Sequence, residues 1–143
     1  MTASHTRTLE TEIPDILQAM SRVHGAIGRY GFDRMLEHLV FLRVSQINKC
    51  SYCVKMHTEE ARADGETNER LDRLIVWRHV EEFSDRERAA FAWAEALTEL
   101  DRRTDIAALR ETVRAQFSET ELGVLTSLVA MINLWNRVQI SQD

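Results

Sequence analysis

The residues of this chain that are best suited to chemistry lie close together between positions 50 and 57. Cys50 and Cys53 are the two cysteines among the 143 residues, and His57 follows the second of them by four positions. Because a side chain four residues further along a helix returns to the same face, His57 can lie beside Cys53 and accept its thiol proton. The pair therefore predicts redox chemistry, metal binding or, in the simplest case, two small buried side chains.

Three features of this segment favour a reactive thiol. The thiolate is the nucleophilic form of cysteine, and a free cysteine with a pKa of about 8.5 is mostly protonated at neutral pH. We expect Cys50 and Cys53 at the beginning of a helix, where the helix dipole favours the thiolate, with His57 as its base. The second thiol can also condense with a sulfenic acid to form a disulfide. This combination fits a thiol peroxidase or a disulfide oxidoreductase.

Charged and polar side chains near the pair are candidates for moving its protons. Glu37 and His38 precede Cys50 by thirteen and twelve residues, on the helix expected before it. An antiparallel helical hairpin would bring one of them over the thiols. Glu60 follows His57 by three residues, so the two share a helix face and Glu60 can orient the imidazole.

A metal site is an alternative use of the two cysteines. A structural zinc ion takes four ligands, whereas the chain has no second C-x-x-C, and His57 with His38 would be the only nearby completion. We therefore expect no metal and no other cofactor. Two small core residues are the remaining alternative, since cysteine is among the residue types most often buried.

Other histidines, tryptophans and amides of the chain are interpreted as structural. The histidines outside the motif have no such neighbours, and the tryptophans fall on apolar helical stripes, which favours the core over a ligand platform. Two asparagines on the last apolar helix are predicted to be buried amides that fix helix contacts. These residues are His5, His24, His79, Trp77, Trp93, Trp135, Asn133 and Asn136.

The composition indicates a helical protein of one domain. The 143 residues suffice for a single core, and only five glycines and one proline interrupt them. Hydrophobic residues make up 44% and charged residues 29%, which is ordinary for a globular protein. We expect a flexible lead-in over residues 1–12 and an all-α domain, a bundle of about six to seven helices, over residues 13–143.

Hydrophobic periodicity and capping signals predict the limits of these helices. Pro14 suits a first helical turn, and Ser-x-x-Glu boxes begin at Ser84 and Ser118. The last helix is apolar around more than one stripe, so we expect it at the centre of the core or partly against another subunit. The predicted ranges are 14–28, 33–48, 50–65, 67–78, 89–100 after the box at 84–87, 106–117 and 119–140.

Charge and hydropathy disfavour several classes of partner. The net charge is −5 and no dense basic patch is present, so we expect no nucleic-acid partner. No stretch approaches the roughly 20 apolar residues of a membrane span, and residues 1–12 show no apolar signal core. We therefore expect no membrane partner and a cytoplasmic protein, in which a C-x-x-C is more often catalytic or metal-binding than structural.

The segment from 39 to 58, with its core S-Q-I-N-K-C-S-Y-C-V-K-M-H from Ser45 to His57, closely resembles the central motif of the alkylhydroperoxidase D-like proteins. These form part of the carboxymuconolactone decarboxylase family. Trp77-Arg78, the run from 83 to 90 and the run from 132 to 137 are also similar to that family. The resemblance extends over roughly residues 13 to 140, and the long motif is specific.

The resemblance implies a helical fold that assembles into trimers or hexamers and reduces hydroperoxides at the expense of a thiol or dithiol reductant protein. By analogy, Cys53 would become a sulfenic acid in an antioxidant peroxidase cycle. Cys50 would donate a proton and then resolve the sulfenic acid as a Cys50–Cys53 disulfide, while His57 would relay protons.

The chain departs from the family pattern at one position of the proton relay. The family commonly has a glutamate twelve residues before the first cysteine, and here that residue is His38. Glu37 lies one step away, which turns its side chain by about 100° around a helix. A histidine can still carry protons at neutral pH.

Two other functions are alternatives to the peroxidase. One is a non-enzymatic redox sensor or disulfide-exchange partner, whose disulfide changes assembly without turnover. The other is a carboxymuconolactone decarboxylase-type enzyme in which the cysteines take no part. The second is disfavoured because family members with that activity typically lack the C-x-x-C.

Overall fold

Over residues 9–143 the fold is entirely helical, as the sequence predicts. The computed structural model describes residues 9–143, so His5 and the first eight residues of the expected lead-in lie outside the described part; residues 9–12 are helical. No helix within residues 9–143 has the length and apolar character needed to cross a membrane. The elements are α2 (Pro14–Gly28), α3 (Arg34–Ile47), α4 (Ser51–Ala63), α5 (Asn68–Arg73), the 3-10 helix η1 (Leu74–His79), α6 (Asp85–Glu99), α7 (Ile106–Arg114) and α8 (Glu119–Ile140).

Side-chain caps set the beginnings of most helices. Both predicted capping boxes form: Ser84 and Ser118 each accept the N–H three residues on, and the glutamate there accepts the N–H of the serine. Asp33 caps α3 by accepting from the N–H groups of Met35 and Leu36. These bonds satisfy donors that a helix leaves unpaired at its first turn.

The single helix predicted over 67–78 is wrong in one respect, because the segment divides into α5 and η1. Val76 has non-helical angles (φ −116°, ψ 27°) and interrupts the α-helical path. Leu74 and Trp77, three residues apart, are both buried in the core. A 3-10 turn aligns residues i and i+3 on one side, so Leu74 and Trp77 both face the core from η1.

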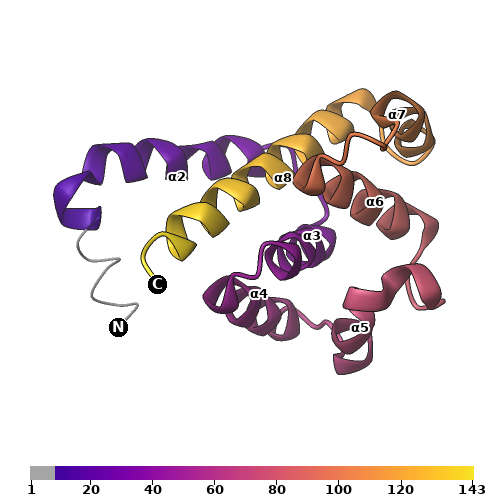
Figure 1. Ribbon diagram of the computed structural model, residues 1–143, viewed down its shortest axis with the longest axis horizontal. Helices are drawn as coiled ribbons and strands as arrows, with labels where there is room; N and C mark the ends of the chain where they lie inside the picture. The colour runs from indigo at the N-terminus through magenta and orange to yellow at the C-terminus, as the bar shows by residue number, and fades with distance from the viewer. Residues whose placement is uncertain (1–8) are drawn as a thin grey trace.

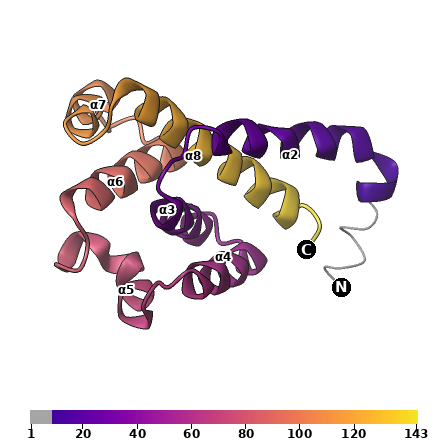
Figure 2. The same cartoon turned by 180° about the vertical axis from the view of Figure 1, so that it is seen from behind.

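Helix α3 runs through the middle of the molecule (Figures 1 and 2). It packs against α4, η1, α6 and α8, and Figure 1 shows it nearly end-on, surrounded by them. The long α8 crosses the other side of α3 and also contacts α2, α4, α6 and α7. The apolar residues around α8 are therefore explained by its central place within the chain. Helix α2 packs along α8, buries Ile27 and extends outward beyond the bundle.

A tight turn joins α3 to α4 and sets the position of the first cysteine. Lys49 has a left-handed backbone (φ 59°), and its N–H donates to the Gln46 carbonyl over 3.2 Å. The N–H of Cys50 donates to the Ser45 carbonyl over 3.1 Å. This pair of bonds is the Schellman motif, which ends a helix and reverses the chain. Cys50 thus follows the end of α3 directly and stands as the N-cap of α4.

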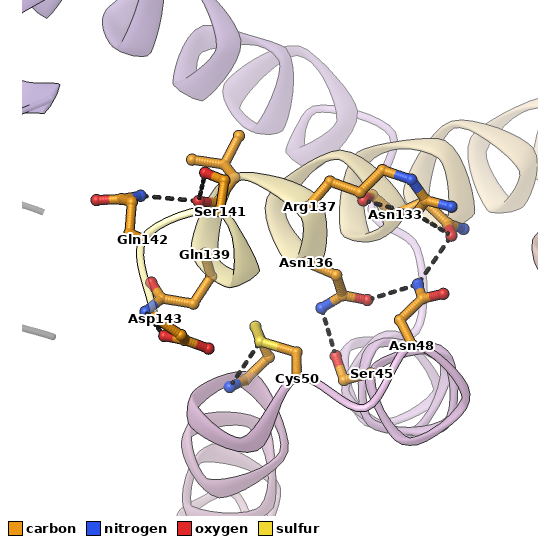
Figure 3. Close-up of a disulfide and its surroundings, with 12 residues drawn as sticks. Ser45, Asn48, Cys50, Asn133, Asn136, Arg137, Gln139, Ser141, Gln142 and Asp143 are labelled. Atoms are coloured by element: carbon orange, nitrogen blue, oxygen red, sulfur yellow. Dashed lines mark hydrogen bonds between the residues drawn. A yellow bond between two sulfur atoms is a disulfide. The ribbon is translucent and has the colours of Figure 1, made fainter. Parts of the chain in front are cut away.

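Buried amides attach this turn to α8 (Figure 3). Asn136 is fully buried, donates to the Ser45 hydroxyl over 3.0 Å and accepts from the Asn48 amide over 2.9 Å. Asn48 also donates to Asn133, which in turn donates to Thr98. The prediction that Asn133 and Asn136 fix helix contacts is confirmed. They hold the C-terminal end of α3, and with it Cys50, against α8.

We predict that Asn136→Ala lowers the free energy of unfolding by about 1–3 kcal/mol, because it removes the hydrogen-bond partner of buried Ser45 and one of the two acceptors of half-buried Asn48. Urea unfolding followed by circular dichroism measures the change. Gln139→Ala, one turn further along α8 and bonded only weakly to Asp143, is the control and should change stability by less than about 0.5 kcal/mol. Equal stabilities for the two variants would contradict this role for the amide.

Candidate thiol site

Cys50 and Cys53 form a disulfide at the N-terminus of α4, which confirms their predicted place at a helix beginning. Cys50 is fully buried and Cys53 is 3% exposed. As the N-cap, the Cys50 sulfur accepts the backbone N–H of Cys53 over 3.3 Å. Once the disulfide is reduced, the same N–H and the helix dipole would stabilise a thiolate at this end of α4.

His57 and Cys53 line one cavity of about 260 Å³. The imidazole is 6% exposed, and its ring lies 5.2 Å from that of Phe41, centroid to centroid. The cavity is almost wholly apolar apart from its histidines and sulfurs, so a charge there is poorly solvated. The other residues around it are His24, Phe41, Met56, Ile132 and Trp135.

Glu60 connects His57 to the second predicted histidine. Its Oε2 lies 3.5 Å from Nδ1 of His57 and 4.0 Å from Nδ1 of His38. The Glu60 side chain is half-exposed, whereas both imidazoles are buried. Nδ1 of His57 faces the carboxylate but makes no hydrogen bond to a described residue, and Nε2 is the nitrogen turned away from Glu60. The expectation that Glu60 can orient His57 thus agrees with the geometry.

His38 is held on its other side by a second carboxylate. Its Nε2–H donates to Oδ2 of Asp64 over 2.6 Å, and Nε of Arg34 donates to the same oxygen over 2.7 Å. These two hydrogen bonds hold the pKa of Asp64 below its ordinary value. His38 therefore stands between two carboxylates of α4, and Glu60 links it to His57.

Glu37 does not join this group. Its carboxyl group makes no hydrogen bond or ion pair with another residue of the described chain, and burial raises the pKa of that carboxyl above the ordinary value, which the nearby charges of His38 and Arg34 oppose. The one-residue step from His38 turns Glu37 to a different side of α3, as helical geometry requires. The structure thus brings Cys50, Cys53, His57 and His38 to one site and leaves Glu37 apart.

Burial dominates the electrostatics of His57. Desolvation lowers the pKa of its imidazole below the ordinary value of 6.5, and the Glu60 carboxylate opposes the shift. His57 is consequently neutral at pH 7 and has a lone pair for a proton. Among residues 9–143 no three His, Cys, Asp or Glu side chains are grouped closely enough to hold a metal ion.

A larger apolar cleft of about 500 Å³ opens next to Cys53. It is formed by the helical residues before α2, by α2 itself, by the first turns of α4 and by the end of α8. Cys53, Met56 and Trp135 belong both to this cleft and to the histidine cavity. A molecule in the cleft would therefore meet the sulfur of Cys53 on the way to His57. Leu9, Pro14, Leu17, Tyr52 and Val138 supply most of its apolar lining.

Two of the residues interpreted as structural belong to this site. His24 lines the histidine cavity, although α2 lies far from α4 in the sequence. Trp135, expected in the core with Trp77 and Trp93, is only half-buried and separates the cavity from the cleft. Sequence periodicity places each on an apolar stripe, and nothing in it indicates that α2 and α8 cross beside the disulfide.

The chain is similar to one sequence family and to proteins of two bacteria. The sequence profile of the Carboxymuconolactone decarboxylase family matches residues 14–96. The chain is 30% identical to the uncharacterized protein YdfG of Bacillus subtilis (strain 168) over 128 residues, which are 90% of this chain and 87% of that protein. It is also 30% identical to the uncharacterized protein YnjA of Escherichia coli (strain K12), over 92% of this chain and 72% of that protein.

Two crystal structures share the fold. A protein of unknown function from Agrobacterium tumefaciens, described as a candidate antioxidant defence protein AhpD, superposes with a TM-score of 0.87 at 31% identity, over 93% of this chain and 91% of that one. An uncharacterized peroxidase-related protein from Silicibacter sp. TM1040 superposes with a TM-score of 0.78 at 18% identity, over 99% of this chain and 82% of that one. The second likeness concerns the fold alone.

The lowered pKa of buried His57 implies that the free energy of unfolding depends on pH. Above pH 6.5 the imidazole is neutral in both the folded and the unfolded chain. As the pH falls below 6.5, His57 binds a proton in the unfolded chain, whereas in the folded protein it does so only at lower pH. The free energy of unfolding therefore falls. We predict that His57→Gln makes this decline between pH 7 and pH 5 shallower in urea unfolding. His79→Gln, at an exposed position, should leave the slope unchanged; a wild-type slope in His57→Gln would contradict the buried neutral imidazole.

Proposed function

This chain belongs to the carboxymuconolactone decarboxylase family, as an alkylhydroperoxidase D-like member, and from that premise we propose that it is a thiol-dependent peroxidase. The observation that carries the proposal is the Cys50–Cys53 disulfide at the N-terminus of α4, with His57 in the cavity beside it. A disulfide between residues three apart is the oxidised half of a dithiol cycle. The substrate would be a hydroperoxide and the product an alcohol or water.

The first step oxidises Cys53. His57 accepts the thiol proton through Nε2, and the Cys53 thiolate attacks the terminal oxygen of the hydroperoxide. The sulfur–oxygen bond forms as the oxygen–oxygen bond breaks, which leaves a sulfenic acid on Cys53 and an alkoxide that takes the proton from His57. Sulfur is oxidised by two electrons and the peroxide is reduced by the same two.

The second step closes the disulfide. The Cys50 thiol attacks the Cys53 sulfur, the sulfur–oxygen bond breaks and water leaves. Cys50 already lies at the N-cap, with its sulfur bonded to the Cys53 N–H, so the two sulfurs need little movement to meet. A thiol or dithiol reductant protein, available in a reducing cytoplasm, would then return both cysteines to thiols.

Glu60 and His38 would carry the protons between the site and water. The carboxylate of Glu60 lies between the two imidazoles and is itself half-exposed, so it offers a route from buried His57 to the surface. In this chain the acid of the relay would come from α4, while His38 occupies the position on α3 where the family commonly has glutamate. Asp64 and Arg34 hold His38 in place.

We predict that Cys53→Ser abolishes hydroperoxide reduction, since no thiolate remains next to His57. Cys50→Ser should still form a sulfenic acid on Cys53, which mass spectrometry detects as one added oxygen, but should lose most steady-state turnover. Consumption of cumene hydroperoxide with dithiothreitol as reductant measures the activity. Ser51→Ala, at an exposed position between them, is the control. Full activity in Cys53→Ser would refute the peroxidase.

We predict that Glu60→Gln slows the reaction of Cys53 with hydroperoxide about tenfold, because the amide keeps the size but cannot carry a proton. It should also lower the pKa of His57, which the carboxylate raises. Single-turnover oxidation at several pH values measures both effects. Glu59→Gln, the exposed neighbour, should behave as the wild type. Identical pH profiles for Glu60→Gln and the wild type would exclude Glu60 from the relay.

A further inference from the structure

A histidine that the cycle above does not use stands in the cavity of Cys53 and His57. His24 of α2 is half-buried, and its ring stacks on Trp135 with centroids 6.1 Å apart and planes 27° apart. The edge of Phe41 is the next aromatic neighbour, at 6.3 Å, and Phe41 also contacts His57. Two imidazoles therefore face one small cavity, with the reactive sulfur on its wall.

The hydrogen bond from Trp135 decides which nitrogen of His24 carries the proton. Nε1–H of Trp135 donates to Nε2 of His24 over 2.6 Å. An indole nitrogen only donates, so Nε2 of His24 must be the acceptor and the ring proton must sit on Nδ1. Nδ1–H makes no hydrogen bond to another described residue. A neutral His24 is thus left with a single N–H donor available to a ligand.

Burial keeps His24 in that state. Desolvation lowers the pKa of its imidazole below the ordinary value of 6.5, so it is neutral at pH 7. Protonation would put a hydrogen on Nε2 against the Trp135 donor and break their bond. A fixed neutral imidazole in a poorly solvated cavity is a hydrogen-bond donor that needs no rearrangement when charge develops nearby.

We propose that His24 is a catalytic residue of the peroxidase reaction, whose Nδ1–H donates a hydrogen bond to the oxygen that leaves when the oxygen–oxygen bond breaks. The proposal rests on the peroxidase function proposed above and deepens it. Negative charge grows on that oxygen in the transition state, and an aligned N–H donor stabilises it there more than in the bound hydroperoxide.

The position of His24 relative to the cleft suits this role. The terminal oxygen must meet the Cys53 sulfur, so the oxygen attached to the organic group lies toward the cleft that holds that group. Trp135 lines both spaces and donates a hydrogen bond to His24, so the imidazole, which lines the cavity, is held by a residue that the cavity shares with the cleft. His57, which is paired with Glu60, exchanges protons, whereas His24 only donates a hydrogen bond and keeps its proton.

The atoms and electrons of the step balance without His24 changing its charge. The thiol proton passes to His57, sulfur bonds to the terminal oxygen, and the oxygen–oxygen bond breaks. The leaving alkoxide, hydrogen-bonded by Nδ1–H of His24, takes the proton from His57. The sum is one thiol and one hydroperoxide giving one sulfenic acid and one alcohol.

Two reactions of the reduced protein separate this role from packing. His24→Phe keeps an aromatic ring on Trp135 but removes the donor, and we expect oxidation of Cys53 by cumene hydroperoxide to slow about 10- to 100-fold. Alkylation of Cys53 by iodoacetamide has no leaving oxygen and should change by less than about threefold. His57→Gln should slow both reactions, and His79→Phe, at an exposed position, should slow neither.

A second variant keeps the proposal testable if the ring substitution disturbs folding. His24→Gln retains an N–H donor and should recover part of the hydroperoxide rate lost in His24→Phe, with both variants checked by thermal unfolding. A wild-type hydroperoxide rate in folded His24→Phe would overturn the role of His24 alone, and so would equal losses in both reactions. A wild-type protein that does not react with hydroperoxide would overturn the peroxidase function as well.

Discussion

The junction between α3 and α4 is the constraint on which the site depends. Its Schellman turn forces a left-handed backbone at Lys49, a conformation that costs a residue with a side chain about 1–2 kcal/mol. The amides of half-buried Asn48 and buried Asn136 hold the turn against α8 through hydrogen bonds to each other and to Ser45. A loose junction would let Cys50 drift from the N-cap, and the second sulfur would lose its position beside Cys53. The hydrogen bonds among Ser45, Asn48 and Asn136 thus hold the two sulfurs at the N-terminus of α4.

Mostly apolar side chains surround the two cysteines, together with the imidazoles of His24 and His57. Desolvation lowers the pKa of His57 and of His24, so both are neutral at pH 7. The Trp135 hydrogen bond assigns the ring proton of His24, whereas the Glu60 carboxylate approaches Nδ1 of His57 to 3.5 Å. The two carboxylates near His38 lie toward the surface, where water reduces the cost of their charge. Charged and polar groups therefore line one side of the site, and the apolar cleft approaches Cys53 from another.

Local chemistry explains which structural predictions succeed. The capping boxes at Ser84 and Ser118 and the place of Cys50 at a helix beginning depend on residues a few positions apart, and all are found. The split of the predicted 67–78 helix was missed because the spacing of Leu71, Leu74 and Ile75 fits an uninterrupted helix and gives no signal of the kink at Val76. His24 was missed for a related reason: its partner Trp135 lies 111 residues away in the sequence.

The sequence by itself determined the helices, the thiol pair and the histidine one turn beyond it, because periodicity, caps and C-x-x-C spacing act within a few residues. It also identified His38 as the unusual member of the site. Only the tertiary structure decided that Glu60 lies between His57 and His38, that Glu37 lies apart, and that His24 faces the same cavity. Those outcomes depend on how α2, α3, α4 and α8 cross. A crossing is set by the packing of whole helix faces, which no local pattern contains.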